Sequence, residues 1–181
     1  MANANTKAKT QSAETAEEKA TSKKEEAQEK KIVAKEIDPE QYVTVRNGFH
    51  GRLVYRSKRT GEKFVWEQFG DEQDMTLREL KNAKNSSKKF FTANWFVFDE
   101  QWIPEYLGVG KLYKYALTIG GFDDIFKLPA NELKSRIDKL SDGQKSSVKY
   151  RAMELIKSGD IDSLKTIAVL EEALGVELTE K

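Results

Sequence analysis

The stretch from Tyr42 to Glu67, YVTVRNGFHGRLVYRSKRTGEKFVWE, decides the fold. Apolar and polar residues alternate along three parts of it, namely 42–45, 52–56 and 63–67. This period of two is typical of β-strands that bury one face. Asn47-Gly48 follows the first part and Arg59-Thr60-Gly61 follows the second, and both are turn signals. Short connections favour antiparallel neighbours, so we predict a small antiparallel β-meander.

Beyond this stretch the hydrophobic period becomes that of an α-helix. Thr76-Leu77-Arg78-Glu79 has the spacing of a capping box and predicts a helix that runs to about Asn85. Three further helices are predicted after Pro129, with Ser141 as a cap and with Gly159 and Gly175 as ends. The predicted fold class is therefore α+β, a β-meander followed by a helical C-terminal module.

Residues 1–36 have a different composition from the rest of the chain. They contain no aromatic residue, no Gly and no Pro, but 8 Lys and 7 acidic residues. Such a segment buries too little apolar surface to offset the entropy of ordering. We predict three parts: a charged low-complexity N-terminal arm (1–36), flexible or ordered by partners, a small β-sheet domain with an aromatic-rich segment (37–120), and the helical module (121–181).

The composition excludes several kinds of site. The chain has no Cys and one His, which rules out disulfides, thiolate chemistry and a multi-His metal site within one chain. His50 lies in a predicted turn with no carboxylate placed to orient it nearby in sequence. We therefore predict no catalytic, metal or cofactor site and a non-enzymatic protein. The net charge of +1 gives no global argument for an acidic partner, and no apolar run is long enough for a bilayer, so a membrane partner is not expected.

Two groups of residues are candidates for binding. The first is aromatic and fits either an ordinary core or a partner interface: Phe90, Phe91, Trp95, Phe96, Phe98 and Trp102. The second is a basic face on the strands: Arg46, Arg52, Arg56, Lys58, Arg59 and Lys63. Basic strands suit the phosphates of a nucleic acid, and they equally suit a complementary protein surface.

The order of several short motifs carries a resemblance. The motifs are Val43-Thr44-Val45-Arg46-Asn47, Gly51-Arg52-Leu53-Val54-Tyr55, Arg59-Thr60-Gly61-Glu62 and Met75-Thr76-Leu77-Arg78-Glu79-Leu80. In this series the chain resembles small proteins encoded among the structural genes of tailed bacteriophages of Gram-positive hosts. The resemblance implies a virion structural or assembly protein, made in the host cytoplasm, whose partners are other virion proteins and itself. It carries over no catalytic residue and no cofactor.

Several questions stay open from sequence. The resemblance does not separate head, neck and tail, and it does not give the oligomeric state. The alternative function is a small nucleic-acid-binding accessory or regulatory protein that uses the basic strands. Inhibition of a host enzyme would use the same surfaces.

Overall fold

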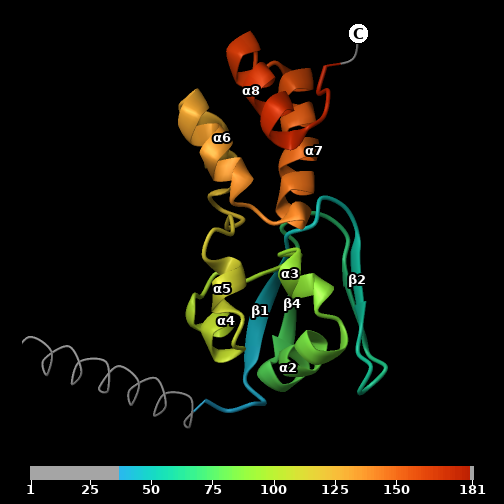
Figure 1. Ribbon diagram of the computed structural model, residues 1–181. Helices are drawn as coiled ribbons and strands as arrows, with labels where there is room; N and C mark the ends of the chain where they lie inside the picture. The colour runs from blue at the N-terminus through green and yellow to red at the C-terminus, as the bar shows by residue number, and fades with distance from the viewer. Residues whose placement is uncertain (1–36, 180–181) are drawn as a thin grey trace, which may run out of the picture. The chain divides into compact units, whose positions relative to one another are not determined.

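The computed structural model describes residues 37–179, and the chain from Pro39 on forms one compact unit. The predicted arm, residues 1–36, lies outside the described residues. Antiparallel strands come first and helices follow, as Figure 1 shows. The predicted α+β class is confirmed.

The strands form two small sheets. β1 (Tyr42–Asn47) is the middle strand of an antiparallel sheet, between β4 (Glu72–Thr76) and β5 (Phe96–Val97). β2 (Leu53–Arg56) and β3 (Lys63–Trp66) form a separate antiparallel hairpin. The predicted pairing of the second and third strands is therefore present, whereas β1 pairs with β4 and β5 in place of β2.

The side chain of Asn47 explains why β1 does not pair with β2. Its amide donates hydrogen bonds to the carbonyls of Gly51 (2.7 Å) and Gln68 (2.8 Å), and its carbonyl accepts from the backbone of Phe49 (2.9 Å). These bonds stabilise a wide loop after β1, where a hairpin between β1 and β2 would need a tight turn. Asn47-Gly48 therefore does mark a change of chain direction, but the strand that follows does not pair with β1.

Strand β5 lies between α3 and α4 in the chain, and the other strands precede the helices of the described part of the chain. Near the sheets lie α2 (Leu77–Ser86), α3 (Lys89–Thr92), α4 (Trp102–Tyr106) and α5 (Gly110–Tyr113). The 3-10 helix η1 (Phe122–Lys127) contributes Phe122 and Ile125 to the core of the helical region. The C-terminal helices are α6 (Ala130–Asp138), α7 (Asp142–Ser158) and α8 (Leu164–Leu174).

The predicted helix ends are confirmed by their local geometry. The hydroxyl of Thr76 accepts from the backbone N–H of Glu79, and Ser141 accepts from that of Gln144. Gly159 ends α7 with φ 85°, a left-handed backbone conformation that residues other than glycine rarely adopt. These signals are local in sequence, which is why they predict the structure well.

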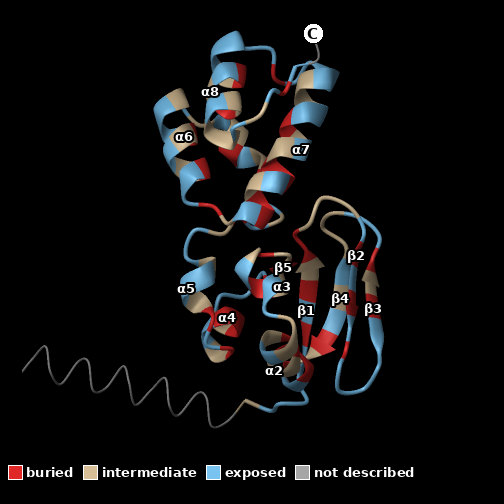
Figure 2. Cartoon of the chain, turned by 45° about the vertical axis from the view of Figure 1, so that its right-hand side comes forward, coloured by how far each residue is buried: buried red, intermediate tan, exposed pale blue. Residues whose placement is uncertain are grey.

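Buried residues, red in Figure 2, gather in two places. Beside the strands, Tyr55, Trp66 and Phe96 pack ring against ring, with centroids 5.4 Å apart for Trp66 and Phe96 and 5.8 Å apart for Tyr55 and Phe96. Among α6, α7 and α8, the fully buried residues include Leu133 and Leu170. The core beside the strands contains apolar residues at the strand period of two, and the core among the helices contains apolar residues at the helical period.

The N-terminal turn of α7 is packed tightly on the loops of the sheet region. A Cβ at Gly143 would lie 2.1 Å from the carbonyl oxygen of Ala93. The hydroxyl of Ser147 donates to the carbonyl of Gly48 at 2.8 Å, and the buried amide of Gln144 bonds both the N–H and the C=O of Leu117. α7 therefore links the helical region to the loop that follows β1.

Candidate functional site

The aromatic candidates separate into buried and half-exposed residues. Phe91, Phe96 and Phe98 are buried, with at most 6% of the residue surface exposed. Phe91 contacts Phe96 edge to face at a centroid distance of 5.5 Å. Of the two alternatives from sequence, core or partner interface, these three residues belong to the core. Phe90, Trp95 and Trp102 are partly exposed.

The basic candidates also divide into two groups. Half of them are in ion pairs: Arg46 with Glu72 and Asp99, Arg52 with Glu67, and Arg59 with Glu79. The other three, Arg56, Lys58 and Lys63, are exposed and make no ion pair within residues 37–179. The predicted basic face is thus reduced to three uncompensated cations on the β2–β3 hairpin.

A buried carboxylate anchors this hairpin to α2. Glu79 is 3% exposed and accepts from the Tyr55 hydroxyl at 2.7 Å and from the Asn82 amide at 2.9 Å. Burial by itself raises the pKa of Glu79, but the hydrogen bonds from Tyr55 and Asn82 and the nearby Arg59 outweigh it, so the pKa lies below its ordinary value. Burial, and then the bond to Glu79, raise the pKa of Tyr55. The pair is therefore an ionised carboxylate with a neutral phenol.

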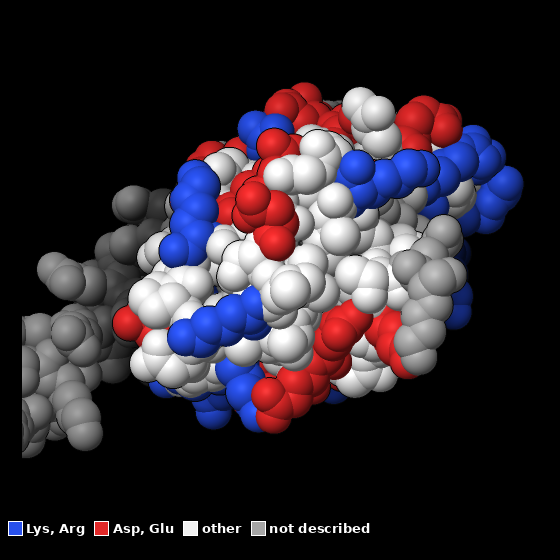
Figure 3. Space-filling model, turned by 90° about the horizontal axis from the view of Figure 1, so that it is seen from above, with Lys and Arg blue, Asp and Glu red and all other residues white. Residues whose placement is uncertain are grey.

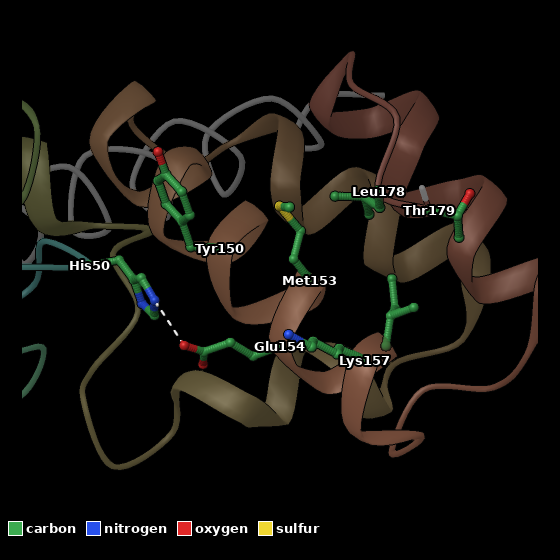
Figure 4. Close-up of a pocket in the computed structure, with 8 residues that line it drawn as sticks. His50, Tyr150, Met153, Glu154, Lys157, Leu178 and Thr179 are labelled. Carbon is green, nitrogen blue, oxygen red and sulfur yellow. Dashed lines mark hydrogen bonds and ion pairs between the residues drawn. The ribbon is translucent and has the colours of Figure 1, made fainter. Parts of the chain in front are cut away.

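A groove of about 560 Å³ lies along α7, and we call it the α7 groove. Its lining residues are His50, Tyr150, Met153, Glu154, Ile156, Lys157, Leu178 and Thr179, and Figure 4 shows how they face one another. Tyr150 and Met153 are large hydrophobic residues with 47% and 37% of their surface exposed. The ring of His50 stacks on Tyr150, with the centroids 5.4 Å apart and the planes within 5°.

A network of hydrogen bonds and ion pairs lies at one side of the groove. His50 Nε2 lies 3.2 Å from Glu154 Oε1, and Arg151 donates to the other oxygen of Glu154 at 3.1 Å. Arg151 also donates two hydrogen bonds to Asp123, at 2.6 and 3.0 Å. These bonds hold the pKa of Asp123 below its ordinary value. The acids here therefore have Arg151 beside them, and the groove also presents the apolar side chains of Tyr150 and Met153 and the cation of Lys157.

The environment of His50 differs from the one that its neighbours in sequence indicate. Glu154 supplies the neighbouring carboxylate that the local sequence lacks, and it does so from 104 residues away. The ring is stacked on Tyr150 and its Nε2 faces Glu154, so we interpret His50 as a contact that holds the loop after β1 against α7. The exposure of Tyr150 and Met153, three residues apart on one helix, could have been found from the inward positions of Val148 and Ala152.

The surface around the helical region is mixed in charge. Viewed from the end that carries α6 to α8, basic and acidic side chains alternate around uncharged surface (Figure 3). Over residues 37–179, no group of three or more His, Asp or Glu side chains is arranged to hold a metal ion. In the same part of the chain, no helix combines the length and the apolar character needed to cross a bilayer.

Comparison with known proteins gives no relative for this chain: no protein family, no curated protein and no solved structure matches it.

Proposed function

We propose that this chain is a non-enzymatic structural or assembly protein of a tailed bacteriophage virion, which binds another virion protein through the α7 groove. The bacteriophage part of the proposal rests on the resemblance of the motifs between Val43 and Leu80. The binding part rests on one observation, the two exposed hydrophobic residues Tyr150 and Met153 beside a concave apolar surface.

These residue types are the ones that protein interfaces favour. Tyr and Met are enriched at the centre of interfaces, whereas an exposed pair of this kind is unfavourable on a protein without a partner. His50 supports the ring of Tyr150 from one side, so the ring loses little freedom when a partner binds. Nucleic-acid binding has less support, because Arg46, Arg52 and Arg59 are already paired with carboxylates.

Quantitative mass spectrometry of purified phage particles tests the proposal. The particles are produced from a genome that encodes this chain, and the copies of the chain per particle are counted. We expect a fixed copy number that survives stringent purification. A protein that is abundant in the infected cell but missing from both particles and assembly intermediates would contradict the proposal.

A paired variant tests the groove itself. Replacing Tyr150 and Met153 by Ser removes the exposed apolar contact, and neither residue is buried. We expect the copy number to fall by about tenfold or more, because central aromatic residues contribute much of the affinity of an interface. Leu164→Ser is the matched control, since Leu164 is 81% exposed and does not line the groove. An equal loss in both variants would show that the groove is not the interface.

A further inference from the structure

The β2–β3 hairpin carries positive charge that no carboxylate of the described residues neutralises. Arg56 and Lys63 are exposed and lie directly opposite each other on the two strands. Their Cβ atoms are then about 5 Å apart, and like charges at such positions destabilise a sheet. Lys58 adds a third cation in the turn, also without an ion pair within residues 37–179. A bound anion would relieve this repulsion.

The cations are held on a well-anchored scaffold. The indole N–H of Trp66 donates to the carbonyl of Val45 at 2.9 Å, and the amide of Gln73 donates to that of Val65 at 3.0 Å. In the turn, the hydroxyl of Ser57 accepts from the backbone N–H groups of Arg59 and Thr60. Because the backbone is fixed before any partner arrives, little ordering is needed on binding.

The surface next to the cations is aliphatic. Val54 and Val65 lie opposite each other on the outer side of the hairpin, and Val54 is 38% exposed. The three aromatic residues of the hairpin point to the inner side and are buried: Tyr55, Phe64 and Trp66. The outer side therefore offers no ring for a base to stack on, which is how single-stranded nucleic acids are usually held.

Acidic residues on the same hairpin also disfavour a nucleic acid. Glu62 follows the turn and Glu67 follows β3, and both are exposed. The phosphates of a nucleic acid follow one another without a gap, so some of them would lie near Glu62 and Glu67 and be repelled. A peptide can carry its carboxylates only where they face cations. Mixed charge around an apolar centre is typical of protein interfaces.

We propose that the outer face of this hairpin, formed by Val54, Arg56, Lys58, Lys63 and Val65, binds an extended acidic segment of another protein. A carboxylate of the segment lies between Arg56 and Lys63 and pairs with both, and an apolar side chain two residues away in the segment packs on Val54 and Val65. In an extended segment, side chains that point to one side recur at every second residue, which matches the alternation along β2. We call this surface the hairpin face.

An NMR titration of the full chain tests the assignment. The probe is a short synthetic peptide in which Glu and Val take turns at every second position, with Thr between them, so that both kinds of side chain lie on one side of the extended peptide. The backbone amide signals of the protein are followed at low and at physiological salt. We expect shifts confined to residues 52–67 that weaken as salt screens the charges. The double variant Arg56→Gln, Lys63→Gln should weaken binding by about fivefold or more, since it removes two ion pairs.

The chain offers a matched control on the same strand. Arg52 lies four residues before Arg56 and is also exposed, but it already pairs with Glu67 at 2.9 Å. Arg52→Gln should therefore change the affinity by less than about twofold. The peptide with Gln in place of every Glu should not shift the signals.

Three results would overturn the proposal. One is the absence of shifts with the acidic peptide at low salt, and another is binding that is equally weak in the Arg52 and the Arg56/Lys63 variants. The third is an oligothymidylate of equal charge that binds the same residues more tightly than the peptide does, which would assign the hairpin face to nucleic acid. None of these results bears on the α7 groove, whose test is the copy number in particles.

Discussion

The α7 groove and the hairpin face use charge in opposite ways. In the groove, Glu154 has both His50 and Arg151 beside it, and the exposed hydrophobic residues Tyr150 and Met153 lie next to this cluster. On the hairpin face, Arg56 and Lys63 stand opposite each other with no carboxylate between them. Ion pairs within the protein serve mainly to hold its own loops and helices. The uncompensated charge of the hairpin face is the feature on which the proposed acidic partner rests.

The largest effect is expected from a variant that disturbs the packing of α7, the helix that lines the α7 groove. Gly143→Ala places a Cβ 2.1 Å from the carbonyl oxygen of Ala93, a backbone atom that cannot rotate away. We expect the free energy of unfolding to fall by about 3 kcal/mol, as for other overpacked sites. Thermal unfolding followed by circular dichroism measures this loss.

The same variant sharpens the comparison between the two surfaces. Its NMR spectrum should change around α7 and the loop after β1, while the amides of β2 and β3 keep their positions. Gly120→Ala is the control, because a Cβ at Gly120 meets nothing within 4 Å. A Gly143→Ala protein as stable as the control would show that the close contact of α7 with Ala93 is not required.

A smaller effect is expected from breaking the anchor of the hairpin. Glu79→Ala leaves the buried hydroxyl of Tyr55 without its acceptor, and we expect a loss of about 2 kcal/mol. Hydrogen exchange should become faster at the amides of β2 and β3, while α7 is unaffected. Glu62→Ala removes an exposed carboxylate of the same hairpin and should leave both stability and exchange unchanged.

The protonation of Glu79 predicts how the stability depends on pH. Since the pKa of Glu79 is lowered in the folded protein, its contribution is present above the ordinary value of about 4.3 and is lost as pH falls through the folded value. The difference in melting temperature between the natural chain and Glu79→Gln should therefore be largest near pH 7 and shrink below about pH 4. A difference that does not change with pH would mean that Glu79 is not ionised when buried.

The smallest effect has the opposite sign. Lys63→Glu turns the opposed pair of cations into a pair of opposite charges, so we expect a gain of about 0.5 kcal/mol in stability. Arg52→Glu, which places a second acid beside Glu67, should cost a similar amount. Chemical denaturation resolves both. A loss of stability in Lys63→Glu would remove the argument that the hairpin face keeps its charge at a cost.

Local signals in the sequence predict the helices and their ends. Thr76, Ser141 and Gly159 act within three or four residues of their own position, so no knowledge of the rest of the fold is needed. The inward faces of β2 and β3 follow in the same way from alternation, and so does the hairpin between them.

Contacts between distant parts of the chain could not be predicted in this way. β1 pairs with β4, and the loop after β1 is held by the side chain of Asn47, whose partners Gly51 and Gln68 are visible only in the folded structure. The dense aromatic segment has the composition of a core and of an interface alike, and only the burial of Phe91 and Phe96 decides between them. His50 and Glu154 meet across 104 residues, so no local pattern predicts the groove that they border.

The hydrogen bond from Ser147 to Gly48 has a consequence for the order of folding. The two residues are 99 positions apart, whereas β2 and β3 are joined by a short turn. Closing a long loop costs more entropy than closing a short one, so we expect the hairpin to form early and α7 to pack last. During synthesis the N-terminal part of the chain leaves the ribosome first. The hairpin face would then be complete before α7 has packed against His50 to form the α7 groove. The two surfaces would become available to their partners at different times.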